Sequence, residues 1–542
     1  MKRRGHKGAT RSAGEHSTPG LEAAPPVRGL LLEAVLAEAL LVLVAIVWCG
    51  STSGVAPHLA SLMACSLANA VSFLEPTDDC RRKASTGLVL GTLVLPTLFA
   101  VQSSQVDALY VAFRLTWWCG LVSNAMRSWM CYLRPRCTAE VSRALGAVAV
   151  LLICGGISAA GDAWLLPALS IFLACWVSIQ SAVPRSFTLG EAVVVAELCA
   201  VLLHVIMFSV ILQVAPLHVL TSKLRKIIAI GLSSAVGISA GNLLLFRALG
   251  GSGSASGSRG VGSERCRAAL HLALTLLSVA LMLEWMSLSI GENSLSWFSD
   301  YVTGHTATPL KFILFYLAVL IPALAFAPGS QQGSRRQVLV RKYFHVLALI
   351  LFVPTILINI RFMALAFAVA IAVFMVVESL RIAKMPVIAS VLDSFMQSYV
   401  DDRDEGVAVL THIYLLLGCA LPVFFTYFVL RGIFSANALL IALSGVTVTG
   451  LGDAMASFCG VHFGRHRWRG SKKTVEGTLA MIAAVLAFQA VCLCAVGFHN
   501  LATASWCKLV LADIFVALLE AKTDQIDNLF LPLYHMALLQ MV

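Results

Sequence analysis

A basic segment interrupts an otherwise apolar stretch of this sequence. Residues 464–478 read GRHRWRGSKKTVEGT and place five permanent cations within nine positions. The glycines at 464, 470 and 477 allow the backbone to turn tightly beside a ligand, and Ser471 and Thr474 add hydroxyl donors. Cations, glycines and hydroxyls in this arrangement predict a loop that binds a polyphosphate. The five cations are Arg465, Arg467, Arg469, Lys472 and Lys473.

Two simpler explanations account for the same charge. Cations beside a membrane span retain a loop in the cytoplasm, and they attract anionic lipid headgroups. The spacing also excludes two common nucleotide-binding motifs. Five residues separate Gly464 from Gly470 and a serine follows Gly470, so the segment is not a Walker A loop, and the sequence contains no GxGxxG. A nucleotide site here would belong to a membrane-embedded type.

A single acid, Asp453, precedes the basic segment within GVTVTGLGDAMASFCG. A carboxylate at the edge of the hydrocarbon layer is costly without a partner, so Asp453 is a functional candidate. Its partner would be a divalent cation or, in the simpler reading, a nearby Lys or Arg. Small residues at 452, 456 and 460 recur every four positions, which predicts a helix face that packs closely against a neighbour.

A group of acids lies near the C-terminal end, in DIFVALLEAKTDQIDNLFLP. Asp513, Glu520, Asp524 and Asp527 stand at offsets of 0, 7, 11 and 14, which is one face of a helix if the helix continues. Such carboxylates could hold the Mg²⁺ ion that bridges nucleotide phosphates. Alternatively, they form the solvated end of a helix.

Other ionisable residues lie within or beside apolar runs without a spacing that indicates chemistry. The segment RKYFH contributes Arg341, Lys342 and His345, which could anchor a helix at the membrane interface or serve a site. Glu378 and His412 pose the same choice between structural pairing and function. The sequence assigns no role to the embedded groups before residue 250. These are Glu33, Glu38, Glu191, Glu197 and His204.

The elements that carry these residues are predicted to be membrane-spanning helices. The 542-residue chain is 59% hydrophobic and 12% charged, and its mean hydropathy is +0.86. Apolar runs of about 20 residues favour an all-α, polytopic integral membrane protein with about 15–16 transmembrane helices. The net charge of +11 is spread over short loops, so no basic domain is available to bind a nucleic acid. The 15 cysteines include no CxxC pair, which argues against a zinc or disulfide framework.

Composition divides the chain into four segments. We expect a disordered cytoplasmic N-terminus over residues 1–28, an N-terminal transmembrane bundle over 29–249 and a Gly/Ser-rich linker over 250–267. Residues 268–542 form a C-terminal transmembrane region. Pairs of spans separate the four polar loops of this region, so the loops share one side of the membrane. Their Lys and Arg content predicts that this side is cytoplasmic.

Four segments of the C-terminal region together resemble the polyprenol kinase family, and in particular its dolichol kinases. The resemblance covers roughly residues 341–532 and rests on RKYFH, THIYLLLGCALP, GLGDAMASFCGVHFGRHRWRGSKKTVEGT and EAKTDQIDNLFLP. It implies a multi-pass enzyme of the endoplasmic reticulum membrane that transfers the terminal phosphate of CTP to dolichol for glycan assembly. It also implies that residues 463–478 bind CTP and face the cytoplasm. That segment comprises Phe463, Gly464, Arg465, His466, Arg467, Trp468, Arg469, Gly470, Ser471, Lys472, Lys473, Thr474, Val475, Glu476, Gly477 and Thr478.

The resemblance implies roles for the charged residues. We expect Arg467, Lys472 and Lys473 to hold phosphate oxygens, because phosphoryl transfer mainly requires positioning and charge neutralisation. Asp453 and Asp527 would bind the divalent cation, which we expect to be Mg²⁺.

The group that accepts the proton of the dolichol hydroxyl stays open among Asp524, Glu476 and His345. Glu476 has a simpler reading, because an acid in the first turn of a helix is favoured by the helix dipole. The catalytic set is then Asp453, Asp524 and Glu476, with Arg341, Lys342, His345 and His412 as further candidates.

Two other functions fit parts of the same pattern. A lipid cytidylyltransferase would use the same cations and carboxylates, but it would join CMP to a phosphorylated lipid and release pyrophosphate. A transporter would line a path with embedded carboxylates and would be expected to show an inverted repeat. No such repeat is visible, since the polar loops of the C-terminal region have no counterpart before residue 250.

Overall fold

The chain is almost entirely helical. The structure is a computed structural model, and it describes residues 27–50, 55–72, 81, 86–100, 107–128, 155–207, 220–249, 261–304, 308–325, 334–385, 389–391, 393, 406–469, 471–498 and 501–542. Across these residues, the one β-type pairing is an isolated bridge between Arg467 and Thr474. The all-α prediction is confirmed. Residues 1–26 of the predicted disordered N-terminus (1–28) and most of the predicted linker (250–260) lie outside the described residues, whereas residues 27 and 28 already belong to a helix.

The first half of the chain forms a helical bundle around α3. Its elements are α1 (Val27–Gly50), α2 (Ala56–Ser72), α3 (Leu88–Ala100), α4 (Asp107–Ser128), the 3₁₀ turn η3 (Ala163–Leu165), α6 (Leu166–Ala182), α7 (Leu189–Ile206) and α8 (Lys223–Ala248). Helix α3 packs against α1, α2, α4 and α7, and all of its residues are buried. Its 13 residues contain no charged side chain, because neighbouring helices surround it on every side.

The second half begins with α9, which starts earlier than expected. Its elements are α9 (Val261–Ile290), α10 (Ser294–Thr303), α11 (Thr308–Ala325), α12 (Ser334–Ile358), α13 (Ile360–Ile382), α15 (Thr411–Phe428), α16 (Ala436–Gly445), the π-helical segment η6 (Val446–Gly452), α17 (Asp453–Phe463), α18 (Val475–Val496), α19 (Thr503–Lys522) and α20 (Asp527–Leu539). Residues 261–267, which we expected in the linker, are helical. Glycine is absent after Gly262 there, and the segment SERCRAAL can therefore extend the helix.

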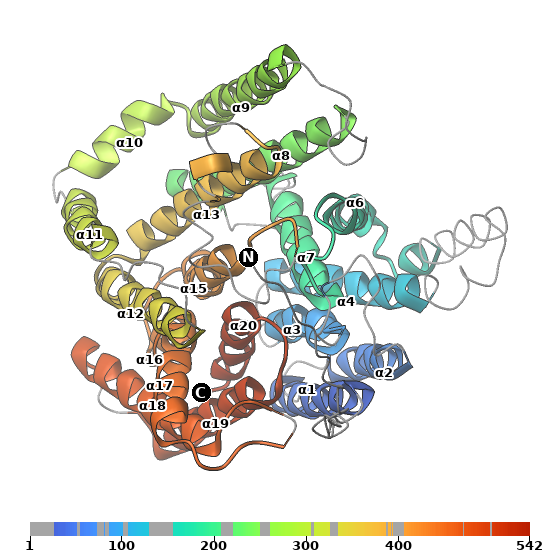
Figure 1. The fold of residues 1–542 in the computed structure, drawn as a ribbon, viewed down its shortest axis with the longest axis vertical. Coiled ribbons are helices and arrows are strands. Elements are labelled where there is room, and N and C mark those ends of the chain that lie inside the picture. Colours follow the sequence, from blue (N-terminus) through green and yellow to red (C-terminus); the bar gives the residue numbers. More distant parts are fainter. Residues whose placement is uncertain are drawn as a thin grey trace, which may run out of the picture.

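Helix α20 joins the two halves. It packs against α15, α16, α19 and η6 from the second half and against α1 and α3 from the first, and Figure 1 shows it near the centre of the molecule. Every residue from Asn528 to Leu539 is buried. Gly418 allows α15 to approach closely, because a Cβ atom there would lie 1.9 Å from the carbonyl oxygen of Asn528. The residues at the start of α20 are therefore held by both halves.

Seven described helices are long and apolar enough to cross a membrane. They are Leu189–Ile206, Lys223–Ala248, Arg265–Ile290, Ile360–Ile382, Thr411–Phe428, Ala436–Phe463 and Val475–Val496. Helices α10 and α11 together could form an eighth, bent span. The polytopic class is confirmed. Part of the difference from the predicted 15–16 lies in segments outside the described residues, such as 129–154. Among the described helices, α3 has only 13 residues and α19 carries Lys508, Asp513 and Glu520.

Candidate active site between a basic loop and an acidic turn

The basic loop, residues 464–474, is a hairpin between α17 and α18. The backbone N–H of Trp468 donates to the carbonyl of Lys473 (3.0 Å), and that of Val475 donates to the carbonyl of His466 (2.9 Å). Thr474 then caps α18, since its hydroxyl oxygen accepts a hydrogen bond from the N–H of Gly477 (3.2 Å). The ladder and the cap fix where each cation of the loop leaves the backbone.

Small residues bring α17 and α18 close together at the base of this loop. A Cβ atom at Gly477 would lie 2.6 Å from the carbonyl oxygen of Ala456, and one at Gly464 would lie 2.6 Å from the methyl carbon of Thr474. A Cβ atom at Gly452 would likewise lie 3.1 Å from side-chain carbons of Met481 and Val485 on α18. The predicted close packing through the 452, 456 and 460 face is therefore present.

The acidic turn, residues 523–526, breaks the helix that the sequence pattern had extended. Helix α19 ends at Lys522 and α20 begins at Asp527, so the four acids do not form one stripe. Asp513 lies deeper in the bundle, where its Oδ1 accepts hydrogen bonds from His535 (3.0 Å) and Gln489 (3.2 Å). The break brings Glu520 and Asp527 together from two different helices.

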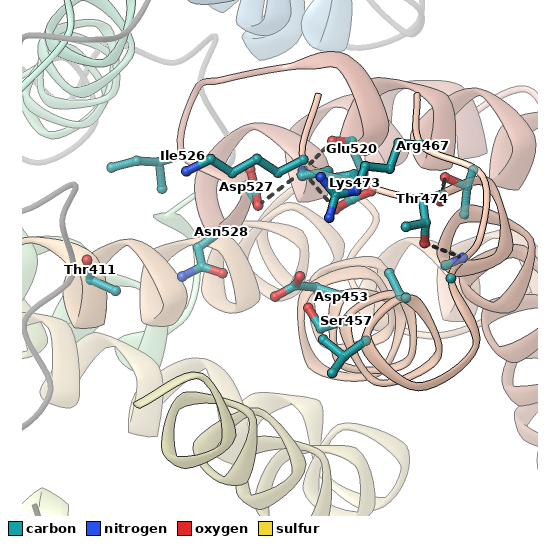
Figure 2. A pocket seen from close by; sticks show the side chains of 17 residues that line it. Thr411, Asp453, Ser457, Arg467, Lys473, Thr474, Glu520, Ile526, Asp527 and Asn528 are labelled. Carbon is teal, nitrogen blue, oxygen red and sulfur yellow. Dashed lines mark hydrogen bonds and ion pairs between the residues drawn. The ribbon is translucent and has the colours of Figure 1, made fainter. Parts of the chain in front are cut away.

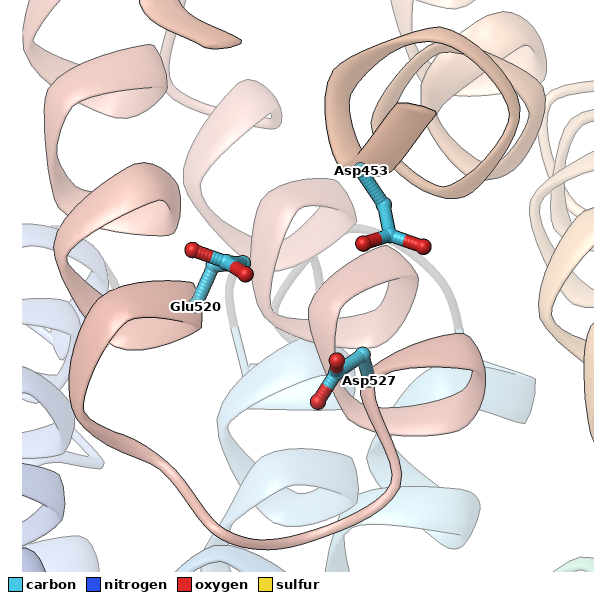
Figure 3. A group of neighbouring side chains, drawn as sticks. All are labelled: Asp453, Glu520 and Asp527. Atoms are coloured by element: carbon cyan, nitrogen blue, oxygen red, sulfur yellow. The ribbon is translucent and has the colours of Figure 1, made fainter. Parts of the chain in front are cut away.

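Three carboxylates converge beside this turn. Asp453, Glu520 and Asp527 each offer an oxygen atom, and these atoms all lie within 4.8 Å of one another. Figure 3 shows the three side chains pointing toward a common centre. Mg²⁺ binds oxygen ligands at about 2.1 Å in an octahedron, so ligand oxygens about 3–4 Å apart suit it. The trio therefore fits a divalent cation, and it includes both residues that were expected to bind one.

Glu520 is the member of the trio that was not among the two residues specifically expected to bind the cation. It appeared only as part of the helical stripe, because the turn after Lys522 was not recognised. Its position seven residues before Asp527 was the available signal. Asp453 reaches the trio from the first turn of α17, directly after the π-helical segment η6. Segments of this kind are frequent at functional sites.

Lys473 links the basic loop to the acidic turn. Its Nζ lies 2.7 Å from Oε1 of Glu520 and 3.6 Å from Oδ2 of Asp527, and it also donates to the backbone carbonyl of Glu520. Figure 2 shows this ammonium group between the loop and the acids. The expected phosphate-binding cation and the expected metal ligands therefore meet at one place.

A cavity of about 570 Å³ lies between the basic loop and the acidic turn. From the basic loop, Arg467, Lys472 and Lys473 line it, whereas Arg465 and Arg469 do not. Sequence reasoning had not singled out Thr411, Ser457 or Asn528, which carried no charge or spacing signal. The lining residues are Thr411, Asp453, Ala456, Ser457, Gly460, Val461, Gly464, Arg467, Lys472, Lys473, Thr474, Gly477, Thr478, Glu520, Ile526, Asp527 and Asn528.

His345 stands directly behind the trio. Helix α12 packs against η6, and Nε2 of His345 lies 3.3 Å from Oδ2 of Asp453. Both side chains are buried, and His345 is not among the residues that line the cavity. The structure thus brings this candidate to Asp453, where it can orient the carboxylate.

Several other candidates lie beside the cavity without lining it. Glu476 accepts hydrogen bonds from the backbone N–H of His466 (3.1 and 3.2 Å), and its Oε1 lies 2.7 Å from Nδ1 of the same residue. Asp524 accepts a hydrogen bond from the amide of Gln525 (3.0 Å) within the acidic turn. His412 follows the lining residue Thr411. The side chains of Arg341 and Lys342, and Gly470, lie outside the described residues.

The rest of the basic loop is held by its surroundings. Nε1 of Trp468 donates to the hydroxyl of Thr478 (2.9 Å), and Nζ of Lys522 lies 5.3 Å from the centre of the indole ring. Arg469 is 90% exposed, and its Nε lies 3.8 Å from Oε1 of Glu33 on α1. Trp468 therefore anchors the loop to α18, while Arg469 points outward.

The loops that were predicted to share one side of the membrane meet at this site. The cavity takes its lining from the start of α15, from the basic loop and from the acidic turn, and His345 near the start of α12 contacts Asp453. Which compartment they face stays a prediction.

Comparison with known proteins places the chain in a family. The family model for dolichol kinase matches residues 135–441. Human dolichol kinase is 33% identical over 281 residues, which cover 50% of this chain and 52% of the relative. A dolichol kinase of Arabidopsis thaliana is 31% identical over 275 residues, 49% of this chain and 47% of the relative. The bovine enzyme is 27% identical over 480 residues, 85% of this chain and 86% of the relative.

These alignments differ in extent. The chain spans about half the length of the human and Arabidopsis relatives it matches and most of the length of the bovine one. No solved structure shows a significant match to it. The family match ends before the basic loop, and it covers more than half of the 542 residues. The chain belongs to the dolichol kinase family.

Proposed function

We propose that this protein is a kinase of the endoplasmic reticulum membrane that transfers the γ-phosphoryl group of CTP to the hydroxyl of dolichol. The observation that carries the proposal is the placement of three converging carboxylates opposite three cations around one cavity. Phosphoryl transfer needs positioning and charge neutralisation, and these groups supply both. CTP, dolichol and the cytoplasmic orientation are carried over from the family resemblance and the distribution of Lys and Arg.

The cations of the basic loop hold the phosphates of the nucleotide. Arg467 offers a planar, forked donor, and Lys472 and Lys473 offer compact charges. Lys473 reaches deepest, since it already contacts Glu520 and Asp527. A phosphate group at this position would therefore lie between the loop and the carboxylates.

We assign the trio Asp453, Glu520 and Asp527 to a divalent cation, with Mg²⁺ as the ion. When bound, this ion neutralises phosphate charge during transfer. The protein's part is to hold three carboxylates from α17, α19 and α20 at a fixed separation. His345 assists by contacting Oδ2 of Asp453 from behind.

The acceptor alcohol enters on the side of the cavity away from the basic loop. Thr411 and Asn528 line that side and can hydrogen-bond a hydroxyl (Figure 2). None of the candidates for acceptance of the alcohol proton, Asp524, Glu476 and His345, lines the cavity. A loose transition state makes a modest demand on a general base.

The fate of the nucleotide's phosphorus atoms tests this proposal. Purified protein supplied with dolichol, Mg²⁺ and γ-labelled CTP should yield labelled lipid and CDP. The same reaction with α-labelled CTP should leave the lipid unlabelled. Labelled lipid from the α-labelled nucleotide, with pyrophosphate as co-product, would instead establish a cytidylyltransferase. Absence of any labelled lipid from either nucleotide, in protein that binds CTP, would overturn the kinase assignment as well.

A further inference from the structure

The acidic turn rests on the N-terminal half of the chain. We propose that Glu38 and Thr188 are positioning residues of the active site, because they fix the turn that brings Glu520 and Asp527 together. The inference rests on the proposed function for the identity of the reaction. Its geometric basis is independent of that function.

The first anchor joins α7 to the middle of the turn. The hydroxyl of Thr188 donates a hydrogen bond to Oε1 of Gln525 (2.8 Å), and both residues are buried. Gly87, with φ of +66°, makes room for this contact, since a Cβ atom there would lie 2.3 Å from Oε1 of Gln525. The side chain of Gln525 is thus held between two segments that lie more than 300 residues away along the chain.

Thr188 is itself held in one orientation. It is the N-cap of α7, and its hydroxyl oxygen accepts from the N–H of Glu191 (3.3 Å) while Oε2 of Glu191 accepts from the N–H of Thr188 (3.0 Å). The other oxygen of Glu191 pairs with Arg81 at 2.8 Å, and both side chains are buried. The acceptor side of the hydroxyl is therefore occupied, and its single proton points to Gln525.

The second anchor joins α1 to the first residue of the turn. The hydroxyl of Thr523 donates to Oε1 of Glu38 (2.8 Å), and Thr523 accepts from the backbone N–H of Gln525 (3.2 Å). Glu38 is completely buried on α1. A hydrogen bond to a buried carboxyl group is stronger than one exposed to water. Two helices of the N-terminal half thus hold two residues of a four-residue turn.

The two anchored residues lie between the metal-binding carboxylates in the sequence. Glu520 lies three residues before Thr523, and Asp527 lies two residues after Gln525. The separation of the two carboxylates is therefore set by the conformation of the turn. Affinity for a small divalent cation depends closely on the separation of its ligands, so a loosened turn should weaken the site even with every ligand present.

Binding of Mn²⁺ measures this effect without turnover. Mn²⁺ accepts the same carboxylate ligands as Mg²⁺, and its binding to purified full-length protein in detergent can be followed by electron paramagnetic resonance in the absence of nucleotide. Thr188→Val and Glu38→Met each remove one anchor. Each should weaken Mn²⁺ binding about two- to tenfold, the range expected for the loss of one buried hydrogen bond. Thr188→Ser keeps the hydroxyl and should restore wild-type affinity.

Two matched controls separate positioning from general damage. Thr116→Val removes a buried hydroxyl that donates to the carbonyls of Ala112 and Phe113 within α4. Glu197→Gln changes a fully buried carboxyl on α7 outside the turn. Both should bind Mn²⁺ as the wild type does. The two anchors lie on separate helices, so failure of one anchor variant to accumulate leaves the other as the test.

The outcomes are distinct for the two proposals. Wild-type Mn²⁺ affinity in Thr188→Val or Glu38→Met would overturn the positioning role, as would an equal loss of affinity in the controls. A wild-type protein that binds Mn²⁺ but forms no phosphorylated lipid would overturn the kinase assignment, and the dependence of Mn²⁺ affinity on the anchors would still stand. Asp527→Asn, which removes a ligand, should abolish the Mn²⁺ signal and defines its background.

Discussion

The basic loop and the acidic turn face each other across one cavity but are built in different ways. The backbone of the loop is held by bonds between near neighbours, and its cations are largely exposed, with the side chain of Arg469 at 90%. The turn is mostly buried and bonds to α1 and α7 of the N-terminal half. A local stretch of sequence can specify the first, whereas the second requires the complete fold.

This difference predicts different responses to mutation. A substitution in the exposed loop should change ligand binding and leave the free energy of unfolding almost unchanged. A substitution in or under the buried turn should change both the geometry of the carboxylates and the stability of the protein.

The largest effect is expected from the carboxylate trio. Asp453→Asn, Glu520→Gln and Asp527→Asn each remove a charge that would hold the divalent cation, which is worth several kcal/mol to phosphoryl transfer. Each should lower kcat/KM by at least about a hundredfold. Added Mg²⁺ should restore little of it. Asp300→Asn, at an exposed position of α10, is the control. Near-normal turnover in all three variants would remove the trio from the catalytic centre.

The cations of the loop should divide into two groups. Arg467→Ala and Lys473→Ala should each lower kcat/KM for the nucleotide by about ten- to a hundredfold, the effect of losing a hydrogen bond to a charged group. Arg465→Ala and Arg469→Ala, which lie outside the cavity lining, should change it less than about twofold.

Steady-state kinetics of the four variants measures their kcat/KM, and thermal melting of each variant is the control for stability. Lys473 also contacts Glu520, so its variant should lower the melting temperature as well, whereas the Arg467 variant should not. Equal losses in all four variants would mean that the loop acts through its total charge.

A smaller effect is expected from the anchor of the loop. Trp468→Phe removes the hydrogen bond to Thr478 and leaves an aromatic ring beside Lys522. The KM for the nucleotide should rise about two- to tenfold with kcat nearly unchanged, because the loop is displaced while the carboxylates stay in place. Trp164→Phe, on η3 of the N-terminal half, is the control. A fall in kcat alone would show that the indole acts on the chemical step.

The smallest effect is expected at Glu476. Its carboxylate braces His466 within the loop and does not line the cavity, so Glu476→Gln should keep kcat within about threefold of the wild type. Turnover measured across pH gives the decisive readout. A loss of more than about a hundredfold, with disappearance of the acidic limb of the pH profile, would identify Glu476 as the general base.

The same contrast explains how much of the site the sequence revealed. Cations, glycines and hydroxyls gathered within 15 residues predicted the basic loop, and Asp453 was singled out because a carboxylate beside an apolar run is costly. Its pairing with Asp527 came from the family resemblance. The all-α, polytopic class followed from the apolar runs. In each case, the residues that led to the prediction lie close together in the sequence.

The features that escaped prediction depend on distant contacts. The break after Lys522 contains no glycine or proline, so the strongest sequence signals of a turn are absent from residues 523–526. Glu520 was therefore placed on a continuous stripe. The anchors Glu38 and Thr188 lie 485 and 337 residues from their partners. No local periodicity encodes contacts of that separation, and single-sequence reasoning left Glu38 without a role.

The length of the candidate span from Ala436 to Phe463 bears on where Asp453 and the basic loop lie relative to a bilayer. Its 28 residues rise about 42 Å at 1.5 Å each, which exceeds a hydrocarbon layer of about 30 Å. Asp453 stands 17 residues from the start of this span, or about 26 Å along it, and the ten residues that follow lift the basic loop about 15 Å higher. If Ala436 marks one edge of the hydrocarbon layer, the carboxylate lies within about 4 Å of the opposite edge and the loop begins about 11 Å beyond that edge. A long lipid alcohol can reach the first without leaving the bilayer, and a water-soluble nucleotide can reach the second without entering it.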